Sequence, residues 1–317
     1  MATYYIRPYN GGSNYGTGDG LSYDNAKAQP ANGQIGITTL FSGFTGGDTV
    51  YLCGTFTAFN NTNPQSACVS FSSLTSLTSE WYVRGDHPQY PGIIDPRQGA
   101  FGGFNGFVKD SVFLNGFING VFTGFTIYSS GRQNTDATTG WSNGPNGIRT
   151  SAGNGFRKAK ITNNTLIGEN VGNTGEARVA IDIVLAANTT TLNDSWFELT
   201  GNTMYGWLKG IEFEKNNTRG EFAKATRRSI CAYNTIYGGG HRDPSFVDGM
   251  GSSGIWDYTL IVEHNDISGF FQDGCDGLGS QCIIWRYNYM HDSGGYYNSS
   301  TIANGFKMGG NAGGNHI

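Results

Sequence analysis

The chain has 317 residues, of which 50 are glycine and 14% are charged, and its net charge at pH 7 is −4. This balance excludes the basic surface of a nucleic-acid-binding protein, and no apolar run is long enough to span a membrane. Frequent Gly, Asn, Ser and Thr disfavour long helices, whereas 20 Phe, 17 Tyr and 6 Trp supply the apolar surface that a disordered chain lacks. Composition therefore favours short strands joined by many turns.

Residues 1–45 are interpreted as an N-terminal cap segment. A strand-like run at Tyr4–Ile6 is followed by a loop rich in Gly, Asn and Ser, and residues 23–28 are predicted to form one short helix that caps the open end of the fold. The first residues lack a basic stretch followed by an apolar one, so no signal peptide is visible. We therefore expect a mature domain, or a phage or viral product exported by another route.

The next apolar runs are short and end at turn residues. They lie at 49–53, 81–84 and 92–94, and each is bounded by Gly, Asp or Pro. Runs of this kind indicate many short strands.

An internal repeat is the most informative pattern in the chain. The motif Asn-x-Leu/Ile/Met begins at Asn164, Asn202, Asn234, Asn265 and Asn288, at intervals of 38, 32, 31 and 23 residues. An interval of 23 fits a single coil of a β-helix, and the longer intervals fit coils that carry one inserted loop. Repetition on this scale is typical of a stacked solenoid.

The repeat also suggests how successive coils hold together. An Asn at a fixed turn would lie over the Asn of the next coil, about 4.8 Å away, and the stacked amides could hydrogen-bond along the axis. The apolar residue two positions later would point inward. A β-sandwich or propeller with Asn-rich hairpins is the alternative, but it would place a turn about every ten residues. We predict an all-β, right-handed parallel β-helix that forms one domain over 1–317.

Two groups of side chains allow more than one interpretation. The five cysteines could form the pairs Cys53–Cys68 or Cys275–Cys282, but small buried thiols in a packed stack are favoured. Residues 209–228 hold six basic and three acidic side chains. We interpret them as a solvated, inserted loop, with a groove for a polyanion as the alternative.

Four charged residues in the last third of the chain have spacings close to one coil. Asp248 precedes Asp273 by 25 residues, and Lys307 follows Asp276 by 31. Three carboxylates and a lysine are thus predicted to lie on neighbouring coils of one face, within 246–310. Carboxylates from two adjacent coils can converge on one hard cation such as calcium.

The stretch Gln272-Asp-Gly-Cys-Asp276-Gly, the earlier Asp248 and the segment Asn304-Gly-Phe-Lys307-Met-Gly-Gly together resemble the pectate lyases of polysaccharide lyase family nine. The resemblance covers about 246–310. It implies a parallel β-helix that cleaves a uronate polymer by β-elimination, with Ca²⁺ as the cofactor. By position, it implies that Asp248, Asp273 and Asp276 are calcium ligands and that Lys307 is the catalytic base.

The chain departs from the family pattern in two ways. Gln272 stands where the family usually has a carboxylate, so we expect an amide oxygen to replace one charged calcium ligand. Family members usually continue through further coils after the lysine, whereas this chain ends at Ile317. It is therefore expected to be a fragment or to have an uncapped final coil.

Further expectations concern the substrate and the alternative functions. Arg286 follows a strand-like run and is a candidate to bind a substrate carboxylate, because its planar guanidinium suits that geometry. The predicted partner is an acidic polysaccharide, met outside the cell or at a virion surface. A glycoside hydrolase on the same fold, or a tailspike-like adhesin that binds a glycan without cutting it, are the alternatives.

Overall fold

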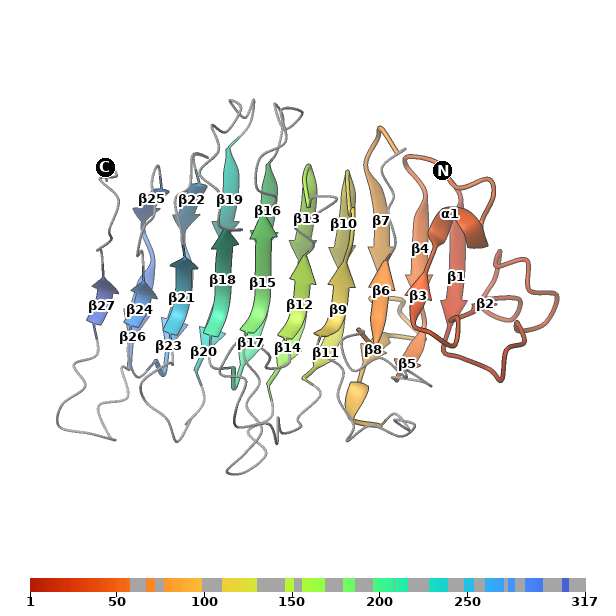
Figure 1. Cartoon of the computed structure of the whole chain (residues 1–317), viewed down its shortest axis with the longest axis horizontal. Helices are drawn as coiled ribbons and strands as arrows, with labels where there is room; N and C mark the ends of the chain where they lie inside the picture. The colour runs from red at the N-terminus through yellow and green to blue at the C-terminus, as the bar shows by residue number, and fades with distance from the viewer. Residues whose placement is uncertain are drawn as a thin grey trace.

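The computed structural model shows the path of the chain through a stack of coils (Figure 1). The residues that it describes are 1–57, 67–71, 77–98, 110–129, 146–150, 156–168, 179–185, 196–207, 209–215, 228–238, 248–253, 260–270, 273–276, 283–292 and 304–307.

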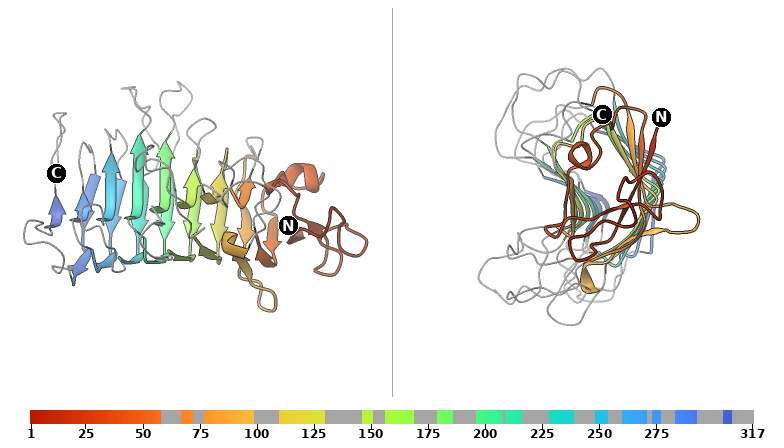
Figure 2. Two further views of the ribbon diagram at one scale, coloured as in Figure 1. Left: turned by 60° about the horizontal axis from the view of Figure 1, so that its bottom comes forward. Right: turned by 90° about the vertical axis from the view of Figure 1, so that its right-hand side faces the viewer.

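Three sheets run along the whole stack, and all of their strand pairs are parallel. From β4 onward, each coil adds one strand to sheet A, then one to sheet C and then one to sheet B, so neighbours within a sheet come from successive coils (Figures 1 and 2). The fold is a right-handed parallel β-helix, in keeping with the handedness of nearly all parallel crossover connections. Among the described residues, no helix has the length and hydropathy needed to span a membrane.

The strands are short, with two to seven residues each. Sheet A contains β1 (Thr3–Arg7), β2 (Lys27–Ala28), β4 (Thr49–Leu52), β7 (Trp81–Arg84), β10 (Gly120–Thr123), β13 (Ala159–Thr162), β16 (Phe197–Thr200), β19 (Ser229–Ala232), β22 (Leu260–Glu263) and β25 (Ile283–Arg286). Sheet C contains β5 (Gly54–Phe56), β8 (Gly92–Ile94), β11 (Thr126–Tyr128), β14 (Thr165–Ile167), β17 (Thr203–Tyr205), β20 (Thr235–Tyr237), β23 (Asp266–Ser268) and β26 (Tyr289–His291). Sheet B contains β3 (Gln34–Ile35), β6 (Val69–Phe71), β9 (Asp110–Leu114), β12 (Asn146–Thr150), β15 (Val179–Leu185), β18 (Lys209–Lys215), β21 (Asp248–Ser253), β24 (Asp273–Asp276) and β27 (Asn304–Lys307).

The core is one continuous column of apolar side chains enclosed by the three sheets. Because side chains alternate along a strand, each coil sends one or two of them inward from every sheet. In sheet C, Leu166 pairs with Met204, which pairs with Ile236, so like positions stack along the axis. All three are almost fully buried. The apolar residue of the predicted repeat therefore points inward, as expected.

The predicted asparagine ladder is confirmed at the turn between sheets A and C. The side-chain amide of Asn202 donates to Asn234 Oδ1 at 3.0 Å, and that of Asn234 donates to Asn265 Oδ1 at 2.9 Å. Links of the same kind join Asn164 to Asn202 at 3.0 Å and Asn265 to Asn288 at 2.8 Å. Each of these amides also donates to a backbone carbonyl, so the ladder holds coils together through satisfied buried polar groups.

The residue before each ladder asparagine has a left-handed backbone. Asn163, Tyr233, His264 and Tyr287 have φ between 53° and 57°, and Gly201 has φ 67° at the same place. The His264 ring stacks between Tyr233 and Tyr287, with centroids 5.1 and 5.2 Å apart. His264 therefore belongs to an aromatic stack that runs beside the asparagine ladder.

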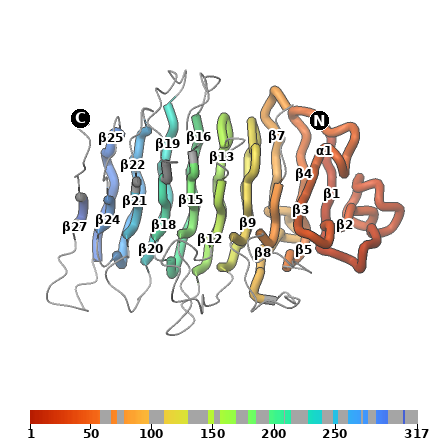
Figure 3. The backbone as a smooth tube through the Cα atoms, viewed as in Figure 1, coloured from red at the N-terminus to blue at the C-terminus, as the bar shows by residue number. Residues whose placement is uncertain are grey.

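The cap of the N-terminal end differs from the prediction. The four-residue helix α1 is Ile37–Leu40, and residues 23–28 are not helical. In that segment, polar side chains bond the backbone instead, because Asn25 N–H donates to Ser22 Oγ and Ala28 N–H donates to Asn14 Oδ1. Figure 3 follows the chain from this cap into the first coils.

Aromatic side chains next to α1 cover the end of the core. Phe41 and Phe44 are buried and pack on Tyr4, with ring centroids 4.5 and 5.7 Å apart. Phe44 also meets the buried ring of Trp81 at 5.9 Å. These contacts join the residues around α1 to the first coils of the core.

Four cysteines are buried free thiols: Cys53, Cys68, Cys231 and Cys275. Burial raises the pKa of Cys53 to about 12, which keeps this thiol protonated and unreactive. The Cys53–Cys68 pairing does not form, and Cys282 lies outside the described residues. The interpretation as small core residues is confirmed for these four.

Candidate active site

The acidic residues singled out in the sequence lie on neighbouring strands of sheet B. Met250 of β21 pairs with Cys275 of β24, and Gly251 pairs with Asp276. The same register sets Asp248 level with Asp273. On the next strand, β27, Lys307 pairs with Asp276.

Each of the acids Asp248 and Asp273 is followed by a glycine whose backbone packs closely against its neighbours. Met250 and Cys275 are fully buried and face inward. A Cβ at Gly249 would lie 2.3 Å from Ile267 Cγ2, and one at Gly274 would lie 2.6 Å from the carbonyl oxygen of Gly305. Only glycine fits where the backbone approaches the core this closely, which explains the Asp-Gly pairs.

The acids belong to a longer set of polar side chains on the outer face of sheet B, which we call the sheet B polar row. Successive strands from β9 to β24 contribute to it. Its members are Asp110, Asn146, Arg149, Asp182, Lys209, Glu212, Asp248, Asp273 and Asp276.

In the first half of the row, opposite charges and amides bind one another. The Asn146 amide donates to Asp110 Oδ1 at 3.0 Å and to Asp182 Oδ2 at 3.4 Å, although all three residues are buried. Arg149 Nε lies 3.3 Å from Asp182 Oδ2. These contacts compensate part of the cost of burying the charges, although Asn146 Oδ1 has no hydrogen-bond partner within the described residues.

In the second half of the row, carboxylates crowd together. Asp248 is 6% exposed and Asp273 is fully buried. Burial raises the pKa of Asp248 from its ordinary value of 3.8 to about 6, with repulsion from Asp276 and Asp273 adding to the rise and the Lys209 ammonium opposing it. Within the described part of the chain, Asp248 Oδ1 has no hydrogen-bond partner. This carboxylate is therefore held at an energetic disadvantage, as functional groups often are.

Lys209 and Glu212 belong to this half of the row and were not predicted as site residues. Lys209 Nζ lies 3.1 Å from Glu212 Oε1 and 3.7 Å from Asp248 Oδ2. The interpretation of 209–228 as a loop is wrong for its first part, because 209–215 forms strand β18. Alternation in Lys-Gly-Ile-Glu-Phe-Glu-Lys, with Ile211 and Phe213 buried, was the available signal. Residues 216–227 lie outside the described residues.

The donor set of the site fits a hard cation in its chemistry. Asp276 and Asp273 repel Asp248, and Asp248 Oδ1 lacks a hydrogen bond within the described residues. A divalent cation bound by oxygen ligands would relieve both disadvantages. Within the described residues, however, no three Asp, Glu, His or Cys side chains converge closely enough to hold a metal ion. Gln272, the expected amide ligand, lies outside them.

The structure does not bring Arg286 to this site. Arg286 is on β25 of sheet A, whereas Asp276 and Lys307 are on sheet B. Its Nε lies 2.6 Å from Glu263 Oε2, on the neighbouring strand β22. The guanidinium fork is thus engaged by an ion pair on another face of the coil.

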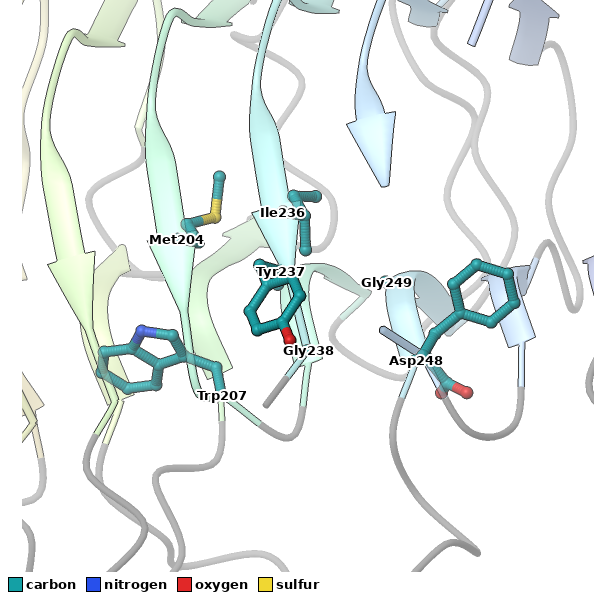
Figure 4. Close-up of a pocket in the computed structure, with 9 residues that line it drawn as sticks. Met204, Trp207, Ile236, Tyr237, Gly238, Asp248 and Gly249 are labelled. Carbon is teal, nitrogen blue, oxygen red and sulfur yellow. The ribbon is translucent and has the colours of Figure 1, made fainter. Parts of the chain in front are cut away.

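A small recess lies at the corner where sheet C leads into sheet B (Figure 4). Met204, Trp207, Ile236, Asp248 and Gly249 are among the residues that line it. In Figure 4, Met204 and Ile236 point to one side of the view and the Asp248 carboxylate to the other. The recess thus brings apolar side chains next to Asp248.

Comparisons with known proteins add little. No family model matches the chain, and no curated protein matches it. Among solved structures, the chain is similar to a tailspike protein of Escherichia coli bacteriophage HK620, solved in complex with a pentasaccharide. The identity is 13% and the TM-score is 0.39, with 92% of this chain and 50% of the tailspike covered, so the chain spans about half the length of that protein.

Proposed function

We propose that this β-helix is a polysaccharide lyase that cleaves a uronate polymer such as polygalacturonate at the outer face of sheet B. One observation carries the proposal: the register of β21, β24 and β27 sets Asp248 level with Asp273 and pairs Asp276 with Lys307. A lysine beside several carboxylates on adjacent coils provides a base next to groups that could bind a cation. The family resemblance of the same residues supports it.

The reaction that suits these groups is β-elimination. Lys307 would take the proton at C5 of a uronate, the electron pair would form the C4–C5 double bond, and the bond from C4 to the glycosidic oxygen would break. The leaving oxygen would be protonated by solvent. A lysine accepts a proton only as the neutral amine, so activity should rise toward alkaline pH.

Charge balance favours a cation at this site. Asp248, Asp273, Asp276 and Glu212 would repel a polyanionic substrate, and Lys209 offsets only part of their charge. We propose that Asp248, Asp273 and Asp276, with Gln272, hold calcium. When bound, calcium would neutralise the substrate carboxylate and stabilise the negative charge that develops as the C5 proton leaves.

The proposed substrate also indicates where the protein acts. An acidic polysaccharide is a component of extracellular matrices and surfaces, so we propose that the protein acts outside a cell or on a virion.

Unsaturated, ultraviolet-absorbing products from a panel of uronate polymers, measured with calcium and with a chelator, test the proposal. We expect absorbance to rise only with calcium and only on a uronate polymer. New reducing ends without ultraviolet absorbance would instead indicate a hydrolase. Binding of the polymer without any shortening would indicate an adhesin.

A further inference from the structure

Four successive strands of sheet C carry no charged side chain on their outer face. In β11, β14, β17 and β20, the middle residue is buried in the core, so the first and third residues point outward. The first residues form a threonine row: Thr126, Thr165, Thr203 and Thr235. The third residues form a second row: Tyr128, Ile167, Tyr205 and Tyr237.

Large rings are exposed at one end of these rows. Tyr205 is 44% exposed and Tyr237 is 51% exposed, and the centroids of the two rings are 6.5 Å apart. Tyr233, two positions before Thr235, is 63% exposed at the neighbouring corner of the coil. A group of exposed aromatic side chains on neighbouring coils is typical of a binding surface, whereas single exposed rings are ordinary.

The hydroxyl groups at this end of the face are available to a ligand. Within the part of the chain that the structure describes, no hydrogen-bond partner is found for four side-chain oxygens, those of Thr203, Thr235, Tyr205 and Tyr237. Each of these hydroxyl groups can donate and accept a hydrogen bond. The face therefore combines apolar rings with free polar groups.

We propose that the outer face of sheet C binds a neutral, β-1,4-linked polysaccharide that runs along the axis of the β-helix. Its sugar rings stack on Tyr205 and Tyr237, and its hydroxyl groups hydrogen-bond to the threonine row. The inference does not depend on the reaction proposed at sheet B, because the ligand is a second polymer bound on another face.

The repeat of the β-helix matches the repeat of such a polymer. Successive strands are about 4.8 Å apart, which is close to the length of one sugar in an extended β-1,4-linked chain. The four strands thus present rows of about 14 Å, enough for about three sugars. Exposed side chains rotate rapidly, so the rings of Tyr205 and Tyr237, tilted by 56° to each other, can turn to a common plane beneath the ligand.

The chemistry of the face favours a neutral sugar over a uronate. A pyranose ring with equatorial substituents presents axial C–H groups of slight positive charge, which suit the negative face of an aromatic ring. A uronate carboxylate would find no cation among the outward residues of β11 to β20. Arg97 lies over the Tyr128 ring at the far end, but it is paired with Asp95. A neutral chain has no charge to compensate.

Calorimetric titration with cellohexaose tests the proposal, in a chelator so that no calcium takes part. The wild type is expected to bind. Tyr205→Ala and Tyr237→Ala should each weaken binding about fivefold, and the double variant about twentyfold or more, because stacking surface is lost. Tyr237→Phe keeps the ring and should bind within about twofold of the wild type.

Tyr82→Ala is the matched control. Tyr82 is a partly exposed tyrosine on β7 of sheet A, so its variant should bind cellohexaose like the wild type. If an alanine variant of sheet C fails to fold, Thr235→Val decides the question. It removes one exposed hydroxyl group at nearly constant shape, with an expected loss of about threefold in affinity.

A wild type that does not bind cellohexaose would overturn the inference, as would wild-type affinity in the folded double variant. A wild-type dimer that the double variant reduces to a monomer in sedimentation would also overturn it, because the face would then join two copies of the chain. The lyase proposal is judged separately, by product absorbance on uronate polymers, so either proposal can fail without the other.

Discussion

The asparagine ladder and the sheet B polar row stack polar side chains along the same axis, with opposite results. In the ladder, Asn202, Asn234 and Asn265 each donate to the next amide and to a carbonyl. In the second half of the row, Asp248 carries a raised pKa and an oxygen without a hydrogen bond among the described residues. The comparison teaches that one corner of the coil satisfies its buried polar groups, whereas the outer face of sheet B holds a buried carboxylate at a cost in stability.

The largest expected effect is a loss of lyase activity when the proposed base on sheet B is removed. Lys307→Ala should lower the rate of appearance of unsaturated product by about 10² to 10⁴-fold, because it removes the proposed base. Thermal stability should change little. Lys160→Ala, on sheet A, should keep wild-type activity. A Lys307→Ala variant that keeps most of its activity would contradict the assignment of the base.

The next largest effect is on stability at the ladder. Asn234→Ala should lower the free energy of unfolding by about 3 kcal/mol, because buried groups on both neighbouring coils lose their partners. Urea denaturation followed by tryptophan fluorescence measures it. Asn288→Ala should lose less, since Asn288 is only part-buried at the last described rung of the ladder. Equal losses would mean that the ladder does not act as a buried network.

A smaller effect, a gain in stability, is expected when the buried carboxylate of the sheet B polar row is neutralised. Asp248→Asn should raise the free energy of unfolding at pH 8, in a chelator, by about 2 to 3 kcal/mol. The pKa of Asp248 is raised from 3.8 to about 6 in the folded protein, so the folded state binds more protons in this window and its stability falls as the pH rises through it. Denaturation at several pH values should show the difference shrinking toward pH 4.

Adding calcium distinguishes the electrostatic cost of Asp248 from its proposed role as a calcium ligand. If the acids hold calcium, adding it should stabilise the wild type more than Asp248→Asn, through preferential binding to the folded state. A variant that is less stable than the wild type in chelator would contradict the view that Asp248 is held at a disadvantage.

The smallest effect is expected at the exposed aromatic stack. Tyr233→Asn should change the free energy of unfolding by about 0.5 kcal/mol or less, because Asn tolerates the left-handed backbone better while the contact with His264 is lost. Asn163 already occupies the equivalent place in an earlier coil. Tyr205→Asn, on a regular strand, is the control. A loss well above 1 kcal/mol would give the stack a structural role comparable to that of the ladder.

Much of the fold could be predicted because its determinants repeat. Each ladder asparagine comes with an apolar residue two positions later, and this pair of signals recurs whatever the length of the inserted loop. The cap could not be placed in the same way, since Asn14 and Ser22 bond the backbone of 23–28 through contacts that no periodicity reveals.

The site was predictable only in part. Intervals close to one coil set Asp248 level with Asp273 and Asp276 level with Lys307. Lys209 was missed because 39 residues separate it from its partner Asp248, and an interval of that length depends on loops. The sequence also could not assign Arg286 to a particular sheet, since a strand-like run has the same appearance in all three sheets.

The varying intervals of the asparagine ladder have a consequence for how such a protein can change. Neighbouring ladder residues are separated by 23 to 38 positions in the chain, yet each hydrogen-bonds the next at nearly the same distance. Axial spacing is therefore independent of the length of chain between rungs. Insertions in the connecting segments can therefore reshape the rim of the solenoid while the spacing of side chains on successive coils stays constant.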